Sequence, residues 1–168
     1  DYKQIIYVPV NTNKQATYNY QIPAGTGGIT ANKLVRDYKV EAIFVGINYY
    51  PGARNNSKFN VERSSTTVTI KEVKVVAKTN VLSVKATLTD YKGNNLIGTN
   101  KVTVKINGRS YIDPKNGKPK YWSVKNGVVD LTGITIDPKT TIKRVMVVTG
   151  ERQAYLEGRA ETTTIVRA

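Results

Sequence analysis

Cysteine and histidine are both absent from the 168 residues of this sequence. Without cysteine the chain can form no disulfide and offers no thiolate ligand to a metal ion. Without histidine it lacks the commonest general base and metal ligand of proteins. These two absences disfavour most enzyme classes. We therefore expect a protein that is not an enzyme and that uses no metal ion or cofactor.

Long apolar runs are missing as well. The longest apolar stretches are short patches such as residues 145–148, whereas a membrane helix needs roughly 18 to 20 residues. The sequence starts without a charged segment followed by an apolar one, so we expect any targeting signal to have been removed or to lie outside these residues. We expect no insertion into a membrane.

Acidic residues are few: 12 Asp and Glu stand against 26 Lys and Arg, which gives a formal net charge of +14 at pH 7. Such an excess favours an anionic partner. Most of the cations, however, stand singly on the outward positions of predicted strands, as Lys85 and Lys105 do. The densest loop cluster comprises Lys115, Lys118 and Lys120. This spacing favours a solvated surface first and an acidic glycan or cell-wall polymer second, and it argues against nucleic acid.

What the sequence does contain is a strong β-strand pattern, clearest around Asn107-Gly108. The five residues before this pair alternate between apolar and polar side chains, the period of a strand with one buried and one wet face. Asn-Gly is the preferred sequence of a type I′ turn, because both positions accept positive φ. The pattern predicts a tight hairpin with Ile106 opposite Arg109 at its tip. Val104 then lies opposite Tyr111, which places the tyrosine ring on the core side.

The same alternation recurs along the chain, and no stretch of useful length has the 3.6-residue period of a helix. We expect an all-β protein, with at most one helical turn near Pro138. In the strand at 121–124 we expect Trp122 in the core and Tyr121 in solvent, with an exposed sugar-stacking platform as the alternative role for Trp122. The strand at 66–77 should have a register break near Lys71-Glu72. The other strands are expected at residues 4–8, 16–22, 38–45, 57–62, 81–90, 128–136, 142–149 and 161–166.

Two segments about 105 residues apart share a pattern. Each has a Gly after a core strand, then a Tyr, then an Arg four residues later. Gly46 and Gly150 are 104 residues apart, and Tyr50 and Tyr155 are 105 apart. A period of this length is typical of a whole domain. We therefore expect a complete unit at residues 66–168 and only about the last four strands of another unit at residues 1–65, with Ser64 and Ser65 marking the boundary.

The incomplete first unit should leave large apolar side chains without cover. Tyr38, Phe44 and Phe59 would face water, at a cost of roughly 1.5 to 3 kcal/mol for each large side chain. Three sources of cover remain open at this point: an upstream half-domain of a longer chain, strands donated by another chain, and packing against the second unit.

Several motifs together carry a resemblance to a known family. They are the segments 104–109, 113–118, 124–128, 16–23 and 38–50, with Phe59-Asn-Val61 and the endings that follow the two tyrosines. They resemble the immunoglobulin-like (Big-type) repeats of adhesin-like surface proteins from methanogenic archaea. The resemblance implies tandem immunoglobulin-like β-sandwiches, the first lacking its N-terminal strands. It also implies a secreted, cell-surface, non-enzymatic array of stacked domains, and it carries over no catalytic residue.

The sequence suggests two sets of candidate binding residues. The first three candidates named next could bind an anionic polymer near one end of the second unit, and the last two could form a ligand site. The candidates are Lys143, Arg144, Arg152, Tyr155 and Arg159. For the first three, a plain solvated rim is the competing interpretation. Because Tyr155 and Arg159 recur as Tyr50 and Arg54, a loop-packing role competes with a ligand site for them.

Carboxylates are too scattered to predict a metal site. Calcium needs several oxygen ligands converging on one ion, and no EF-hand spacing exists in the sequence. The same scatter argues against a pair of carboxylates for glycoside hydrolysis. The carboxylates considered are Asp90, Asp113, Asp130 and Asp137.

Three functions follow, in order of preference. The first is a structural spacer and adhesin segment of an extracellular surface protein, with neighbouring immunoglobulin-like domains or copies of itself as partners. The second is a subunit of an extracellular fibre, assembled by donor-strand complementation of the open first unit. The third is a binding module for an anionic glycan or cell-wall polymer.

Overall fold

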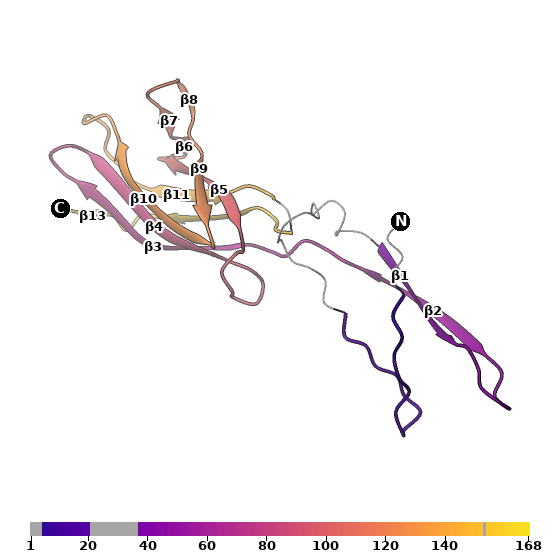
Figure 1. Ribbon diagram of the computed structural model, residues 1–168. Coiled ribbons are helices and arrows are strands. Elements are labelled where there is room, and N and C mark those ends of the chain that lie inside the picture. Colours follow the sequence, from indigo (N-terminus) through magenta and orange to yellow (C-terminus); the bar gives the residue numbers. More distant parts are fainter. Residues whose placement is uncertain (1–4, 21–36, 153) are drawn as a thin grey trace.

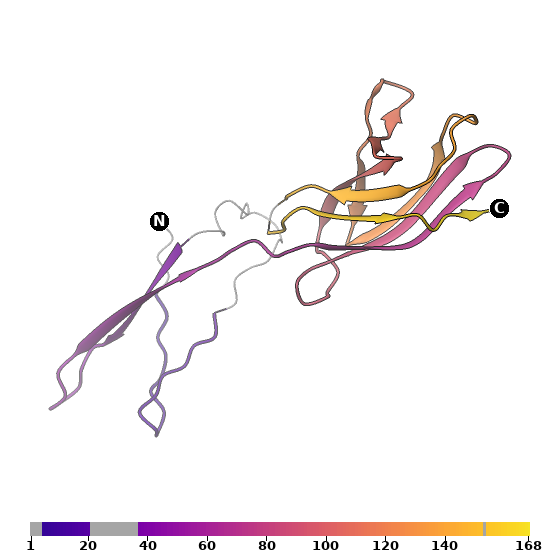
Figure 2. The ribbon, with the colours of Figure 1, turned by 180° about the vertical axis from the view of Figure 1, so that it is seen from behind.

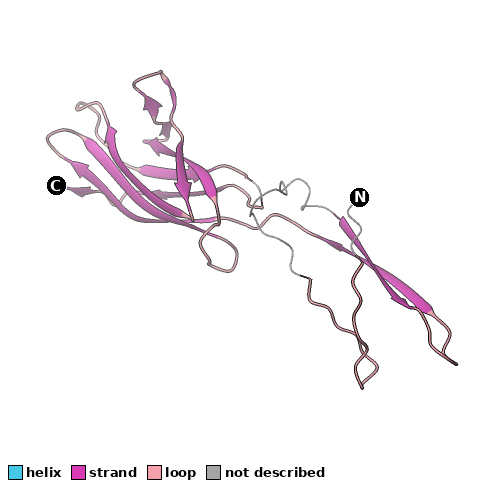
Figure 3. Cartoon of the chain, viewed as in Figure 1, coloured by secondary structure: helices cyan, strands magenta, loops and turns pink. Residues whose placement is uncertain are grey.

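The structure is a computed structural model, and it describes residues 5–20, 37–152 and 154–168. Regular structure in these ranges consists of strands only (Figure 3), which confirms the all-β prediction. The strands are β1 (Asp37–Phe44), β2 (Ala53–Asn60), β3 (Thr67–Val76), β4 (Val81–Thr89), β5 (Thr99–Ile106), β6 (Arg109–Ser110), β7 (Ile112–Asp113), β8 (Lys118–Pro119), β9 (Trp122–Lys125), β10 (Val128–Thr135), β11 (Val145–Thr149), β12 (Gly158–Thr162) and β13 (Val166–Arg167).

The main body is one nine-stranded sheet that curls strongly on itself (Figure 1). The strand order is β12-β11-β5-β9-β10-β4-β3-β13, and β6 pairs with β5. The short strand β9 pairs with β5 on one side and with β10 on the other, so the two halves form one continuous curled sheet. After β12 the chain crosses to the opposite edge, where β13 pairs in parallel with β3.

The core fills the concave side of the curled sheet. It is built by the alternating inward residues of the long strands, as their period of two requires. Leu82, Val84 and Leu88 of β4 are fully buried, as the sequence pattern predicted. They pack in one cluster with Val104 of β5 and Val147 of β11. Burial of each such side chain contributes roughly 1.5 to 3 kcal/mol relative to exposure.

Both tight turns form as predicted. Asn107 and Gly108 have φ values of 52° and 87°, and Asn126 and Gly127 have 52° and 68°. Ile106 pairs with Arg109. Positive φ at two successive positions is the requirement of a type I′ turn, which asparagine and glycine meet with little strain.

The aromatic residues after the first turn also lie where they were expected. Tyr111 and Trp122 are both partly buried against the core, and their rings stack with centroids 5.7 Å apart. Tyr121 is 62% exposed. The predicted register break is confirmed too, because the pairing of β3 with β4 shifts between Ile70 and Glu72.

Several predicted strands are wrong in place or extent. Residues 5–8 and 16–20 form no strand, and the remainder of those two predictions, residues 4 and 21–22, lies outside the described residues. A period of two gives a segment only the tendency to pair, and a strand persists when a neighbour accepts its hydrogen bonds. Residues 142–144 precede β11 as an extended connection, and the predicted strand at 161–166 is divided between β12 and β13. Near Pro138 the chain makes a turn, in which Thr140 donates to the Asp137 carbonyl at 2.8 Å, without a helix.

Candidate interaction site on the exposed hairpin

The first described strands form a hairpin that stands apart from the curled sheet. β1 and β2 pair antiparallel over eight residues each, from Asp37↔Asn60 to Phe44↔Ala53. Figures 1 and 2 show this hairpin projecting away from the main sheet, at the end opposite to the C-terminus. Almost every residue of the two strands is exposed.

One face of this hairpin is apolar in spite of its exposure. Val40 is 50% exposed and Phe44 is 41% exposed, and both lie on the same face of β1 as Tyr38. The Tyr38 ring stacks on Phe59 of β2 with centroids 5.2 Å apart and planes 8° from parallel. An isolated two-stranded hairpin is marginally stable in water at best. Contact of its apolar face with another strand or surface would therefore stabilise the hairpin.

The hairpin repeats the pairing of β11 with β12, 105 residues further along the chain. Phe44 pairs with Ala53 just as Thr149 pairs with Gly158, and both partners are displaced by the same 105 residues. The connecting loops agree as well. Ile47 and Tyr50 form an isolated antiparallel bridge, and so do Arg152 and Tyr155. The repeat seen in the sequence is thus a repeat of backbone pairing.

Tyr155 and Tyr50 occupy these equivalent loops in opposite environments. The Tyr155 ring is 6% exposed, and its hydroxyl accepts a hydrogen bond from the backbone N–H of Ile97 at 3.2 Å. Tyr50 is 70% exposed. In the described structure, the loop around Tyr50 lacks the surrounding strands that enclose the loop around Tyr155.

The Tyr155 loop also holds the segment that joins the hairpin to the main sheet. Ser64 donates its N–H to the Ala154 carbonyl at 2.7 Å and accepts the Leu156 N–H at 2.8 Å. The Thr66 hydroxyl donates to the Leu156 carbonyl at 2.7 Å. Arg63 forms an ion pair with Glu151. We call residues 63–66 with residues 151–152 and 154–158 the junction clasp.

The Asn107 side chain fixes the backbone of Lys143 and Arg144 just before β11, at the end of this strand opposite to the junction clasp. The Asn107 side-chain oxygen accepts the N–H of Lys143 at 2.8 Å and that of Arg144 at 3.3 Å, while its amide nitrogen donates to the Thr141 carbonyl at 2.8 Å. The Arg144 guanidinium is 3.4 Å from Glu161. One of the two cations is therefore already paired with a carboxylate.

The five candidate binding residues do not form one cluster, and the three predicted to bind an anionic polymer near one end of the unit are divided between the two ends of β11. Lys143 and Arg144 precede β11, whereas Arg152 and Tyr155 follow it in the junction clasp. Arg159 is exposed on β12 opposite Val148. Tyr155 presents its ring to the core. Only the four cations offer charge to a ligand, and they are spread along the length of β11.

In the loops, the carboxylates of Asp90 and Asp113 accept hydrogen bonds from backbone N–H groups of their own turns. The pKa of Asp113 is held below its ordinary value of 3.8, chiefly by the backbone N–H of Lys115 and next by the side chain of Lys120. The two contacts measure 3.0 Å each. For Asp90, desolvation raises the pKa, but hydrogen bonds from Asn94 and Lys92 outweigh it and lower the pKa overall. Within the described part of the chain no three acidic side chains gather where they could hold a metal ion.

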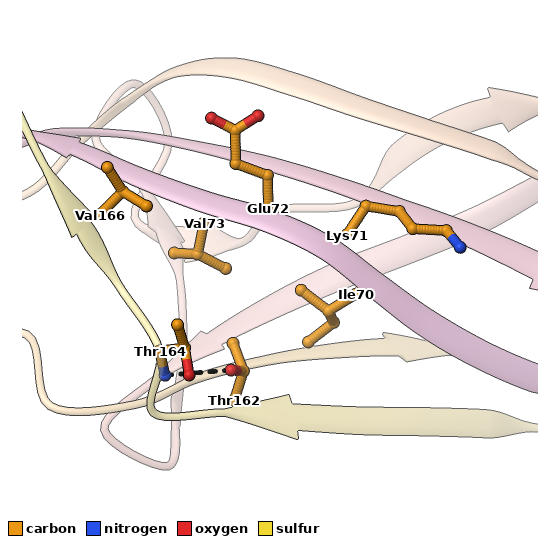
Figure 4. Close-up of a pocket in the computed structure, with 7 residues that line it drawn as sticks. All are labelled: Ile70, Lys71, Glu72, Val73, Thr162, Thr164 and Val166. Atoms are coloured by element: carbon orange, nitrogen blue, oxygen red, sulfur yellow. Dashed lines mark hydrogen bonds between the residues drawn. The ribbon is translucent and has the colours of Figure 1, made fainter.

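A shallow groove lies where the two edges of the curled sheet approach each other. Its volume is about 290 Å³, and it is bordered by the register break of β3. Figure 4 shows Ile70 and Val73 pointing toward Thr162 and Thr164, with Glu72 directed away. Thr164 donates its N–H to the Thr162 hydroxyl at 3.1 Å. The lining combines two threonine hydroxyls and apolar side chains with one charged residue of each sign, Lys71 and Glu72.

Sequence reasoning missed the junction clasp and the role of the Asn107 side chain. Both depend on contacts between segments 34 to 92 residues apart, for which a local pattern gives no signal. The one local clue was the pair of serines at 64 and 65, which were expected to lie at the boundary between the two predicted units.

In the described residues no helix is long and apolar enough to cross a membrane. No protein-family model matches the chain, and no curated protein matches it.

Proposed function

We propose that this chain is a segment of an extracellular, non-enzymatic array of immunoglobulin-like domains, which acts as a structural spacer and adhesin on a cell surface. The observation that carries the proposal is the repeated hairpin, which keeps the same pairing after a displacement of 105 residues. A displacement of this size corresponds to one domain in a tandem array.

The strand order supports an immunoglobulin-like unit. The series β12-β11-β5 follows the order of strands G, F and C in such a sandwich, and β3-β4-β10 follows that of A, B and E. β9 lies between the two series, in the position of a strand that joins both sheets. Residues 66–168 are then one unit, and β1 and β2 are the last hairpin of another.

The junction clasp supports a stiff connection between units. Two backbone hydrogen bonds of Ser64, the hydroxyl of Thr66 and the ion pair of Arg63 tie the joining segment to the next unit. A joint held by several hydrogen bonds restricts domain rotation, whereas a free polar linker permits it. Stiffness of this kind suits a spacer that projects a binding end from a surface.

The proposal is tested with a chain that carries two complete units joined through this junction. Residual dipolar couplings of the two units should fit one common alignment tensor. Antibodies against the chain should label intact, unpermeabilised source cells. Independent tensors together with an absence of surface labelling would contradict the spacer function.

A second function, as a subunit of an extracellular fibre, is favoured by the exposed hairpin. Its apolar face and the outer edge of β1 offer a place for a strand from another chain. Sedimentation of the full chain over a range of concentrations tests it: growing, open-ended polymers are expected of a fibre subunit, and a monomer at every concentration would exclude this function.

A further inference from the structure

The outer edge of β1 has a counterpart in the complete unit, and that counterpart is occupied. β11 pairs with β12 on one side and with β5 on the other, from Val145↔Ile106 to Thr149↔Val102. In the described residues β1 pairs with β2 alone. The described residues therefore display the same hairpin twice, once with its neighbouring strand and once with no described strand beside it.

We propose that the outer edge of β1 is a binding site for a strand of the β5 type, the strand that pairs with the equivalent edge of β11. The inference rests on the repeat that supports the proposed function. The displacement of 105 residues also fixes the register. The strand should bind antiparallel, with its counterpart of Ile106 opposite Val40 and its counterpart of Val102 opposite Phe44.

The backbone groups that would receive this strand follow from the complete unit. Ile106 and Arg109 flank a two-residue turn and are hydrogen-bonded to each other, and Tyr111 donates to the Val104 carbonyl at 2.8 Å. Alternate residues of a strand direct their backbone N–H and C=O groups to opposite sides. Since those of Val104 and Ile106 point to β6, those of Thr103 and Lys105 point to β11. The residues opposite them, Met146 and Val148, direct their backbone N–H and C=O groups to β5.

The corresponding residues of β1 are Glu41 and Ile43, 105 positions earlier. Their N–H and C=O groups point away from β2 and toward the open edge. Such a row of backbone donors and acceptors on a sheet edge is the template for strand addition.

Side chains favour the same strand. Val145 and Val147 of β11 are fully buried, and their counterparts Val40 and Ala42 occupy the same face of β1. Opposite Met146 the complete unit places Lys105. In β1 the position of Met146 is taken by Glu41, whose carboxylate lies 3.7 Å from the Arg54 guanidinium of β2. A lysine of the incoming strand would meet this carboxylate from the other side of β1. Opposite charges in this position stabilise a cross-strand pair by roughly 0.2 to 1 kcal/mol.

The source of the strand is restricted by the same geometry. In a folded unit, β5 is held between β11 and β9, so it cannot leave without opening the sheet. β5 of residues 66–168 is therefore not the donor while its own sheet stays closed.

The test uses the full chain and a labelled peptide with the sequence of residues 99–106, Thr-Asn-Lys-Val-Thr-Val-Lys-Ile. Fluorescence anisotropy measures binding, and amide hydrogen exchange shows where it occurs. We expect binding together with new protection at Glu41 and Ile43. A peptide of the same composition with its apolar residues placed consecutively should not bind.

Two matched proline variants locate the edge. Ile43→Pro removes an N–H directed at the incoming strand and should weaken peptide binding about tenfold or more. Asn56→Pro removes an N–H on the outer edge of β2 and should leave the affinity unchanged. Contact between the rings of Tyr38 and Phe59, observed by NMR, reports that the hairpin persists in both variants.

A charge exchange tests the register. Glu41→Lys should weaken binding by about two- to fivefold, and a peptide with glutamate in place of the lysine at position 105 should restore it.

No binding of the peptide to the full chain, or protection confined to β11 or β12, would overturn the proposal. The spacer function would survive that result if two joined units still share one alignment tensor.

Discussion

The hydroxyl of Tyr155 accepts the backbone N–H of Ile97 at 3.2 Å, which ties the loop after β11 to the loop before β5. The ring itself is buried, whereas the equivalent ring of Tyr50 is exposed. Tyr155 is thus part of the core, whereas Tyr50, at the equivalent position of the repeat, has no such enclosure among the described residues.

We expect Tyr155→Phe to lower the free energy of unfolding by about 1 kcal/mol, the net value of one hydrogen bond. Tyr155→Ala should cost roughly 3 to 5 kcal/mol, since it also leaves a cavity. Urea denaturation followed by circular dichroism measures both. Tyr50→Phe is the matched control, and a loss of similar size there would contradict this account.

The Asn107 side chain makes three hydrogen bonds to the segment before β11. Asn107→Gly keeps the positive φ of the turn but removes these bonds, so we expect a loss of about 1 to 2 kcal/mol in the free energy of unfolding. Asn126 occupies the same turn position and has no side-chain hydrogen bond to the described residues. Asn126→Gly should change stability by less than about 0.5 kcal/mol, and equal effects at the two sites would refute the role of the side chain.

Gly158 lies against the junction clasp, where a Cβ atom would be 2.7 Å from the carbonyl oxygen of Thr66. Gly158→Ala should therefore displace Thr66 and lower the free energy of unfolding by about 1 to 3 kcal/mol. Around Gly150, apart from the residue itself and its chain neighbours, no heavy atom of the described residues lies within 4 Å of such a Cβ, and Gly150→Ala should not destabilise the protein. Thermal unfolding of the two variants gives the comparison. A Gly158→Ala protein as stable as the parent would show that the close approach is unimportant.

Asp113 should make the β7–β8 loop sensitive to acid. Its carboxyl pKa is lowered in the folded protein, so its stabilising contribution is full above the ordinary value of 3.8 and is lost as the pH falls through the lowered value. Lys120, which binds this carboxylate, lies 5.8 Å from the Trp122 ring centroid. Fluorescence of Trp122, the single tryptophan, should change in that acid range, and Asp113→Asn should abolish the change. A titration identical in the variant would assign it to another group.

The elements that local chemistry determines were predictable. Asn-Gly fixes a turn through the φ values of two residues, and the turn then fixes the register of Ile106 with Arg109. The inward face of β4 followed from its alternation alone. These features require no knowledge of distant segments.

The elements that depend on distant partners were not predictable. Residues 5–8 and 16–20 alternate like strands but pair with no described neighbour. Ser64 was predicted only as a boundary residue, and its hydrogen bonds to Ala154 and Leu156 join segments too far apart for a local pattern to indicate. At the candidate site, the sequence indicated that the first unit lacks strands. It could not show that the outer edge of β1 repeats that of β11, since that follows from the pairing of both hairpins.

The parallel pairing of β13 with β3 has a mechanical consequence. β3 begins at the junction clasp and β13 pairs with its far half, at Lys74 and Val75. A force that pulls Thr67 and Arg167 apart would drag the two strands past each other lengthwise. Their hydrogen bonds would then be loaded together in shear and could not open one after another. A chain tethered in this way should resist stretching more than the few bonds of β13 suggest.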